Sequence, residues 1–76
     1  VLLDVRSAAE FASANAPGSR NIPLAELSAR LSEVPRNVPV VVCCASGTRS
    51  AMAVVLLKKN GFTAVYNAGS WTALAV

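Results

Sequence analysis

The sequence predicts one α/β domain over residues 1–76, with a parallel sheet that helices cover on both faces. Two short apolar runs, residues 1–5 and 40–43, have the length and β-branched content of buried strands. Segments with helical patterns separate them, and strands that alternate with helices are typical of parallel sheets. The composition is 54% hydrophobic and 14% charged, which suits a packed core. A chain of 76 residues is too short for a second domain.

The first half of the chain predicts one strand and two helices. Residues 1–5 form the strand, and a helix begins after Ser7, because Ser7 and Glu10 have the spacing of a capping box. Residues 21–23 are expected to be extended, since a residue that precedes proline avoids the helical region. Leucines at helical spacing then predict an amphipathic helix over residues 24–34.

The second half contains the strongest strand of the sequence, residues 40–43, which is apolar on both faces and therefore expected to be central. Ligands of such sheets bind beyond the carboxyl ends of the strands, and residues 4–6 and 44–49 both follow a strand. The remaining segments are expected to be a loop at 44–49, a helix at 50–57, a strand at 63–66, a turn at 67–70 and a helix starting at 71.

Composition excludes several classes of function. The net charge of +3 is small and its arginines are scattered, which argues against a nucleic-acid interface and favours small anions. There is no histidine, and two adjacent cysteines make a poor metal site and no disulfide scaffold, so we expect neither metal nor cofactor. No apolar run approaches the roughly 20 residues of a membrane span. Val1 is not an initiating Met, so we expect a mature form, a trimmed chain or a piece of a longer one.

The chemistry is expected in the loop that starts at Cys44. A loop between a strand and a helix can turn several backbone N–H groups inward, and the helix adds the positive end of its dipole. Gly47 permits a backbone conformation that side chains disfavour, and Arg49 supplies a positive charge suited to oxyanions. These features should lower the pKa of Cys44 from about 8.5 to neutral or below and make its thiolate a nucleophile.

This loop resembles the active-site signature of rhodanese-like sulfurtransferases: a cysteine, two residues, glycine, one residue, arginine and serine. Further motifs of that family occur in the same order and cover nearly the whole chain: Leu3-Asp4-Val5-Arg6, Glu10-Phe11, Pro17-Gly18, Asn21-Ile22-Pro23, Gly61-Phe62 and Asn67-Ala68-Gly69-Ser70-Trp71. The family's usual opening strand and helix are missing before Leu2, and the end after Trp71 is short. Asn15, Ala16 and Ser19 also depart from the family pattern.

The resemblance implies a rhodanese-like fold and a sulfurtransferase that carries sulfane sulfur as a Cys44 persulfide. The donor would be thiosulfate or a similar small anion, and the acceptor cyanide, a thiol or a protein. Arg49 would help bind the donor. The other substrate-binding residues implied are Ala45, Ser46, Gly47, Thr48 and Ser50.

Asp4 and Arg6 are expected to support the loop. Arg6 and Glu10, four residues apart, predict an ion pair that holds the first helix. Asp4 is expected to orient loop N–H groups or to play a structural role behind the site. Cys43 should point away from Cys44, as neighbours on a strand do, and serve as a core residue.

Two other functions stay open. The first is a module of the same fold that docks partners or senses redox state without catalysis. The second is a phosphatase or arsenate reductase that uses Cys43, because five residues separate Cys43 from Arg49. Against the second, Gly47 has the sulfurtransferase spacing from Cys44, and no residue is marked as the acid that a leaving alkoxide needs. A reactive thiol fits the cytoplasm or the periplasm, with the cytoplasm slightly favoured.

Overall fold

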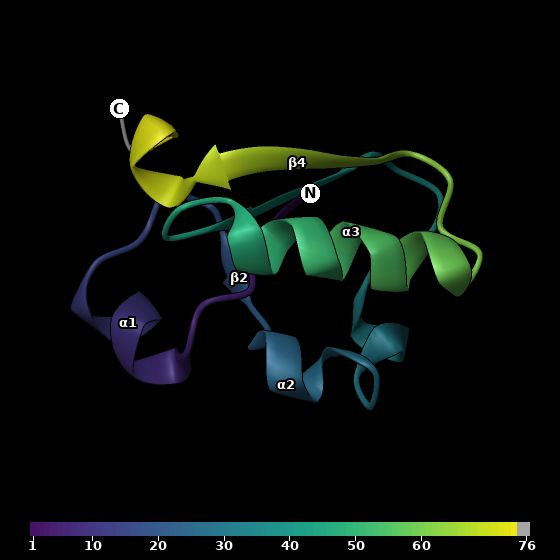
Figure 1. Ribbon diagram of the computed structural model, residues 1–76, viewed down its shortest axis with the longest axis horizontal. Helices are drawn as coiled ribbons and strands as arrows, with labels where there is room; N and C mark the ends of the chain where they lie inside the picture. Colours follow the sequence, from purple (N-terminus) through teal and green to yellow (C-terminus); the bar gives the residue numbers. More distant parts are fainter. Residues whose placement is uncertain (75–76) are drawn as a thin grey trace.

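The protein, described here by a computed structural model over residues 1–74, is a four-stranded parallel sheet with helices (Figure 1). The strand order is β2-β1-β3-β4, so the strand that leads into the loop at Cys44 is central, as predicted. Every neighbouring pair of strands is parallel, which confirms the expected fold class. The strands are β1 (Leu2–Asp4), β2 (Arg20–Asn21), β3 (Val40–Cys44) and β4 (Val65–Ser70).

Three α-helices and two 3₁₀ turns connect or follow the strands. The longest helix, α3, packs on β3, β4 and α2, and Figure 1 shows it lying along the sheet. No helix within residues 1–74 is long and apolar enough to span a bilayer. The helical elements are α1 (Ala8–Ser13), α2 (Leu24–Leu27), η1 (Leu31–Glu33), α3 (Thr48–Lys59) and η2 (Trp71–Ala73).

The main core lies between the sheet and the face of α3 that meets it. Alternate residues of β3 point into this core, as expected for a strand with a period of two. Burial of these side chains is the main force that holds α3 on the sheet. The core residues are Leu3, Val5, Ile22, Leu27, Val34, Val40, Val42, Cys44, Ala53, Leu57, Phe62 and Val65.

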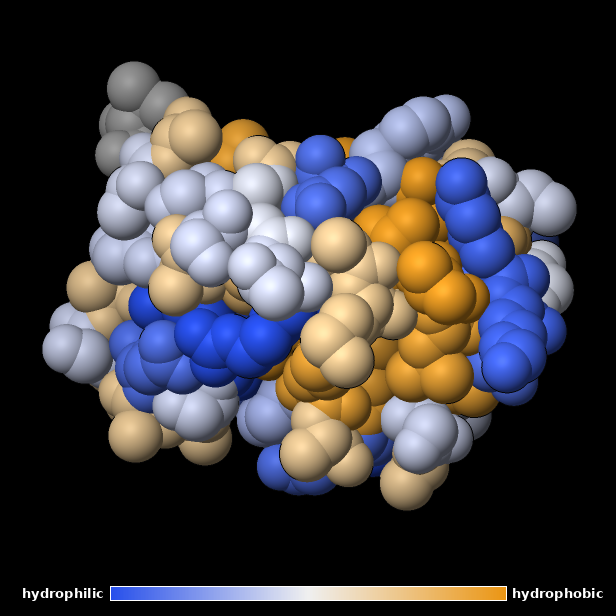
Figure 2. All heavy atoms as spheres, viewed as in Figure 1, coloured by the Kyte–Doolittle hydropathy of each residue, from blue (hydrophilic) through white to orange (hydrophobic). Residues whose placement is uncertain are grey.

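The opposite face of the sheet is more open. Leu2, Val41 and Tyr66 occupy neighbouring register positions on β1, β3 and β4, and Tyr66 is 58% exposed. The outer surface of α3 is also partly apolar, since Met52 and Val55 are exposed. Figure 2 shows hydrophobic residues gathered on this face of the molecule beside hydrophilic ones.

The helix expected over residues 24–34 is wrong as one continuous element. It ends at Leu27, and the backbone N–H groups of Ala29 and Arg30 donate to carbonyls three residues back instead of four. This tighter winding lets Leu31 pack against the core beside the fully buried Leu27. Tertiary packing therefore overrides the helical pattern, because the intrinsic helix propensity of each residue contributes little free energy. Arg30 bridges the break through ion pairs to glutamates on both sides.

The turn expected at residues 67–70 is wrong as well, because these residues continue β4. An irregularity between Val42 and Cys43 shifts the register, so that Cys43 pairs with Gly69. Gly69 has a φ of 80°, and a bulge of this kind needs a backbone angle that glycine tolerates best. The asparagine and glycine that read as a turn in the sequence instead form a bulged strand. The helix expected from residue 71 is the short turn η2, and residues 75–76 lie outside the described part of the chain.

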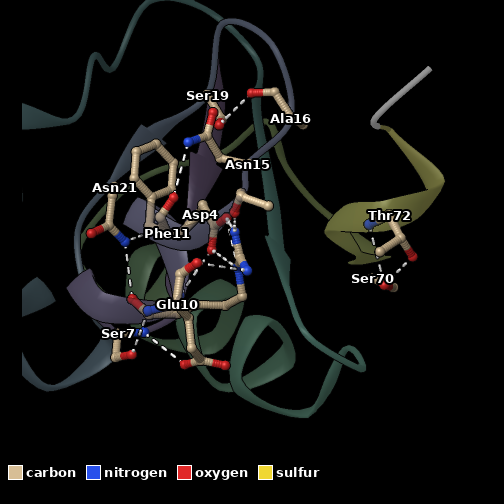
Figure 3. A network of polar contacts seen from close by, with 12 residues as sticks. Asp4, Ser7, Glu10, Phe11, Asn15, Ala16, Ser19, Asn21, Ser70 and Thr72 are labelled. Atoms are coloured by element: carbon tan, nitrogen blue, oxygen red, sulfur yellow. Dashed lines mark hydrogen bonds and ion pairs between the residues drawn. The ribbon is translucent and has the colours of Figure 1, made fainter.

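A buried ion pair ties the carboxyl end of β1 to its surroundings. The Arg6 guanidinium donates to both carboxylate oxygens of Asp4, at 2.7 Å from Nη2 to Oδ2 and 3.0 Å from Nε to Oδ1. It also donates to the backbone carbonyls of Glu10, within α1, and of Ala14, just after the helix, and so holds α1 in place. Trp71 stacks on the guanidinium at 4.5 Å. Figure 3 shows Asp4 and Glu10 within this polar network.

We predict that Arg6→Met strongly destabilises the fold. Asp4 is fully buried, and removing its cation leaves a buried carboxylate without a counter-charge, which costs about 3–5 kcal/mol. Urea unfolding measures this loss. Arg20→Met is the matched control, because Arg20 is exposed, and it should change stability by less than about 0.5 kcal/mol. Equal effects of the two substitutions would contradict the structural role given to Arg6.

Candidate active site

Cys44 is the last residue of β3, and only three residues separate it from α3. The loop therefore spans residues 45–47, shorter than the expected 44–49, and Arg49 and Ser50 belong to the first turn of α3. Gly47 is the N-cap of that helix. The free N–H groups of the first helical turn consequently lie close to the Cys44 side chain.

Two backbone N–H donors and one hydroxyl surround the Cys44 sulfur. The Gly47 N–H lies 3.0 Å from Sγ, the Ser50 N–H 3.3 Å, and the Ser50 hydroxyl 3.4 Å. Burial by itself raises the pKa of Cys44, but hydrogen bonds from the Ser50 hydroxyl and from backbone N–H groups outweigh it and lower the pKa to about 7. The positive end of the α3 dipole acts in the same direction. At neutral pH a large fraction of Cys44 is therefore thiolate.

Ser50 couples this sulfur to β4. Its hydroxyl lies 2.7 Å from Asn67 Oδ1, and its single proton can be donated to Asn67 or to Sγ but not to both. When Cys44 is ionised, donation to Sγ stabilises the negative charge. Asn67 Oδ1 then keeps its hydrogen bond from the Gly69 N–H, at 2.9 Å.

Asn67, Gly47 at the end of the loop and Gly69 in β4 together fix the shape of the loop. The Asn67 side-chain amide donates to the Gly47 carbonyl at 3.2 Å. Gly47 has a φ of 102°, and a Cβ there would lie 3.3 Å from the Gly69 Cα, so both its backbone angle and its surroundings favour glycine. At Gly69 a Cβ would meet no atom within 4 Å, and its φ of 80° alone favours glycine. Sequence reasoning missed Asn67 as a site residue, because it read residues 67–70 as a turn. A polar residue between apolar strand positions was the available signal.

Cys43 lies in a different environment. It is fully buried on the face of β3 opposite to Cys44, as expected for a core residue. Burial raises the pKa of Cys43 to about 11, and the neighbouring Asp4 carboxylate adds to the shift. Its thiol is therefore neutral at ordinary pH.

The expected ion pair between Arg6 and Glu10 is wrong. Arg6 pairs with Asp4, which lies beside it at the end of β1, while the Glu10 carboxylate pairs with Arg49. The distances are 2.7 Å from Nη1 to Oε1 and 3.0 Å from Nη2 to Oε2. The capping box is confirmed, since Glu10 also accepts from the Ser7 N–H. Asp4 orients no loop N–H group, because its carboxylate is occupied by the guanidinium and backbone N–H of Arg6.

Three more of the predicted site residues form the outer edge of the site. Ala45, Ser46 and Thr48 are exposed, whereas Ser50 is buried beneath them. The Ser46 and Thr48 hydroxyls lie 3.5 Å apart, side by side over the start of α3. Cys44 itself is fully buried, so a reactant meets these exposed residues before the sulfur. Within residues 1–74 no three His, Cys, Asp or Glu side chains gather closely enough to hold a metal ion.

Comparison with known proteins decides the family. The model of the rhodanese-like domain matches residues 1–75. The chain belongs to this family. It is similar to the thiosulfate sulfurtransferase PspE of Escherichia coli, with 36% identity over 76 residues that cover 97% of this chain and 73% of that protein. It is also similar to the uncharacterized protein YqhL of Bacillus subtilis, with 42% identity over 66 residues, 87% of this chain and 52% of that protein. The rhodanese-like chain thus spans about half the length of YqhL.

Solved structures confirm the rhodanese-like fold. A rhodanese with anions from E. coli superimposes with a TM-score of 0.88 and 34% identity, covering 99% of this chain and 91% of the other. A rhodanese-related protein from Thermoplasma volcanium gives a TM-score of 0.85 and 32% identity, covering 95% of this chain and 71% of the other. The fold implied by the sequence motifs is therefore confirmed over the described residues.

We predict that alkylation separates the two cysteines by pH. Modification of Cys44 by iodoacetamide should accelerate about tenfold per pH unit below pH 7 and level off above it, because the thiolate is the nucleophile. Cys43 should react only near pH 11. Peptide mass mapping after timed quenching measures both rates in the same sample, so Cys43 is the internal control. A midpoint above pH 8.5 for Cys44 would show that the loop does not stabilise its thiolate.

Proposed function

We propose that this domain is a sulfurtransferase that carries sulfane sulfur as a Cys44 persulfide. Membership of the rhodanese-like family supports the class of activity. The choice of Cys44 rests on the two backbone N–H groups that donate to its sulfur and on the Ser50 hydroxyl beside it. The proposed donor is thiosulfate or a similar compound, and the proposed acceptor is cyanide or a thiol, including a thiol of another protein. The name of the E. coli relative, a thiosulfate sulfurtransferase, supports thiosulfate as one donor.

The first half of the proposed reaction loads the sulfur. The Cys44 thiolate attacks the outer sulfur of thiosulfate, a sulfur–sulfur bond forms, and the bond to the sulfonate sulfur breaks. Sulfite leaves with the electron pair. Sulfite is a stable anion that needs no proton to depart, so the absence of histidine from the chain is compatible with this step.

The second half releases the sulfur. Cyanide attacks the outer sulfur of the persulfide, forms thiocyanate and returns the electron pair to Cys44 as a thiolate. A thiol acceptor in its ionised form becomes a new persulfide by the same displacement. The N–H groups of Gly47 and Ser50 face the sulfur and can stabilise the negative charge of the Cys44 thiolate at the start and at the end. We assign Ala45, Ser46 and Thr48 to the recognition of donor and acceptor, because they are the exposed residues of the site.

The structure disfavours the phosphatase alternative. A phosphatase centred on Cys43 would need that thiolate in the loop, yet Cys43 is buried on the opposite face and its pKa is raised to about 11. The alternative of a non-catalytic module is disfavoured by Cys44, whose pKa is lowered to about 7 by contacts that an inert core cysteine does not need.

We predict that the two cysteines differ in their effect on sulfur transfer. Cys44→Ala should reduce the transfer rate by at least about a thousandfold, because it removes the nucleophile, while Cys43→Ala should retain most of the activity. The assay follows thiocyanate formation from thiosulfate and cyanide. Urea unfolding of both variants controls for the fold. The reverse pattern would move the active site to Cys43, and full activity of both variants would refute the role of the loop.

A further inference from the structure

We infer that Glu10 is a specificity-determining residue, which neutralises Arg49 and makes the site favour sulfur donors of low charge over dianions. This inference rests on the proposed sulfur transfer at Cys44. Its donor class would be alkyl hydropersulfides, R–S–SH, with thiosulfate as a poorer substrate. The residue that sets this preference comes from α1, outside the loop that carries the cysteine.

The pair of Glu10 and Arg49 has the geometry of a strong charge-assisted interaction. Two parallel hydrogen bonds of 2.7 and 3.0 Å join both guanidinium Nη atoms to both carboxylate oxygens. Hydrogen bonds from Arg49 and from Ser7 lower the pKa of Glu10 to about 2, so the carboxylate is ionised at every ordinary pH. Figure 3 shows Glu10 and Ser7 together at the start of α1. Arg49 is therefore held by a permanent counter-charge.

Four other cations of residues 1–74 are either paired or far from the loop. Arg6 is buried and paired with Asp4. Lys58 and Lys59 lie at the far end of α3, about 15 Å away along a helix that rises 1.5 Å per residue, beyond the screening length of physiological salt. Arg36 packs on Phe62 and donates to Asn60, which follows that same far end. The site consequently attracts anions mainly through backbone N–H groups and the helix dipole.

The charge of the donor matters because the nucleophile is itself an anion. When Cys44 attacks thiosulfate, a thiolate approaches a dianion, and nearby positive charge is needed to offset the repulsion. When it attacks the terminal sulfur of a protonated hydropersulfide, a new sulfur–sulfur bond forms, the old one breaks, the proton stays on the transferred sulfur, and R–S⁻ leaves with the electron pair. One negative charge is present before and after this step. When Arg49 is neutralised, the repulsion between the thiolate and its donor therefore disfavours thiosulfate more than a hydropersulfide.

Glu10→Gln tests this directly. Glutamine can keep the hydrogen bond from the Ser7 N–H that completes the capping box, but it removes the negative charge. We expect the KM for thiosulfate to fall about threefold to tenfold, because a unit charge near the site contributes roughly 1 kcal/mol, and kcat to stay within about twofold. The kcat/KM for 2-hydroxyethyl hydropersulfide, a donor that carries at most one negative charge, should change by less than about twofold.

The matched control is Glu33→Gln, which makes the same change in net charge. Glu33 lies on η1 and forms an exposed ion pair with Arg30. This substitution should leave both donors unaffected. A fall in the KM for thiosulfate that is equal in the two variants would overturn the inference, since it would reflect net charge alone. An unchanged KM in Glu10→Gln, with unfolding midpoints of all three proteins alike, would overturn it as well.

A binding readout separates this inference from the proposed function. Sulfate, a dianion that transfers no sulfur, should protect Cys44 from iodoacetamide at about threefold to tenfold lower concentration in Glu10→Gln than in the unsubstituted protein. If neither donor adds sulfur to Cys44 in the unsubstituted protein, the proposed function fails, and the shift in sulfate protection alone decides the role of Glu10. Equal protection in both proteins would overturn that role even where sulfur transfer is observed.

Discussion

The closure of a three-residue loop around the Cys44 sulfur is the constraint on which the site depends. The end of β3 and the first turn of α3 must come close enough for two backbone N–H groups to reach Sγ, at 3.0 and 3.3 Å. Gly47 makes the turn with a positive φ, and the bulge at Gly69 leaves room for it. Asn67 joins the two segments through hydrogen bonds. The register shift in β4 therefore helps to shape the candidate active site, although no residue of that shift carries chemistry.

A second chain of contacts connects the rest of the fold to the same loop. Arg6 is fixed by the buried Asp4 and donates to backbone carbonyls at Glu10 and Ala14, so it sets the position of α1. That position brings the Glu10 carboxylate to Arg49 in the first turn of α3. The buried pair thus acts on the charge of the site from a distance, through a helix of only six residues. The Asp4–Arg6 pair and the electrostatics of the loop are therefore linked through the position of α1 and not by direct contact.

Local sequence patterns predicted those features of the fold and of the site that depend on neighbouring residues. The capping box at Ser7, the central strand before Cys44 and the lowered pKa of Cys44 were predicted correctly, because each depends on neighbouring residues. The loop itself is shorter than predicted, because α3 already begins at Thr48. The partner of Glu10 was missed, since Arg49 is 39 residues away and the i, i+4 rule favoured Arg6. Asn67 was missed because Asn-Ala-Gly has the composition of a turn, and only pairing with β3 makes it a bulged strand. The break after Leu27 depended on packing that no local pattern contains.

The most direct test of the account is the intact mass of the protein after incubation with thiosulfate or a hydropersulfide, before and after cyanide is added. We expect a gain of roughly 32 Da, one sulfur atom, that maps to Cys44 and that cyanide removes. Cys44→Ala should show no gain, and Cys43→Ala should gain as the unsubstituted protein does. No gain from either donor, while Cys44 still reacts with iodoacetamide, would contradict the claim that this thiolate carries sulfur.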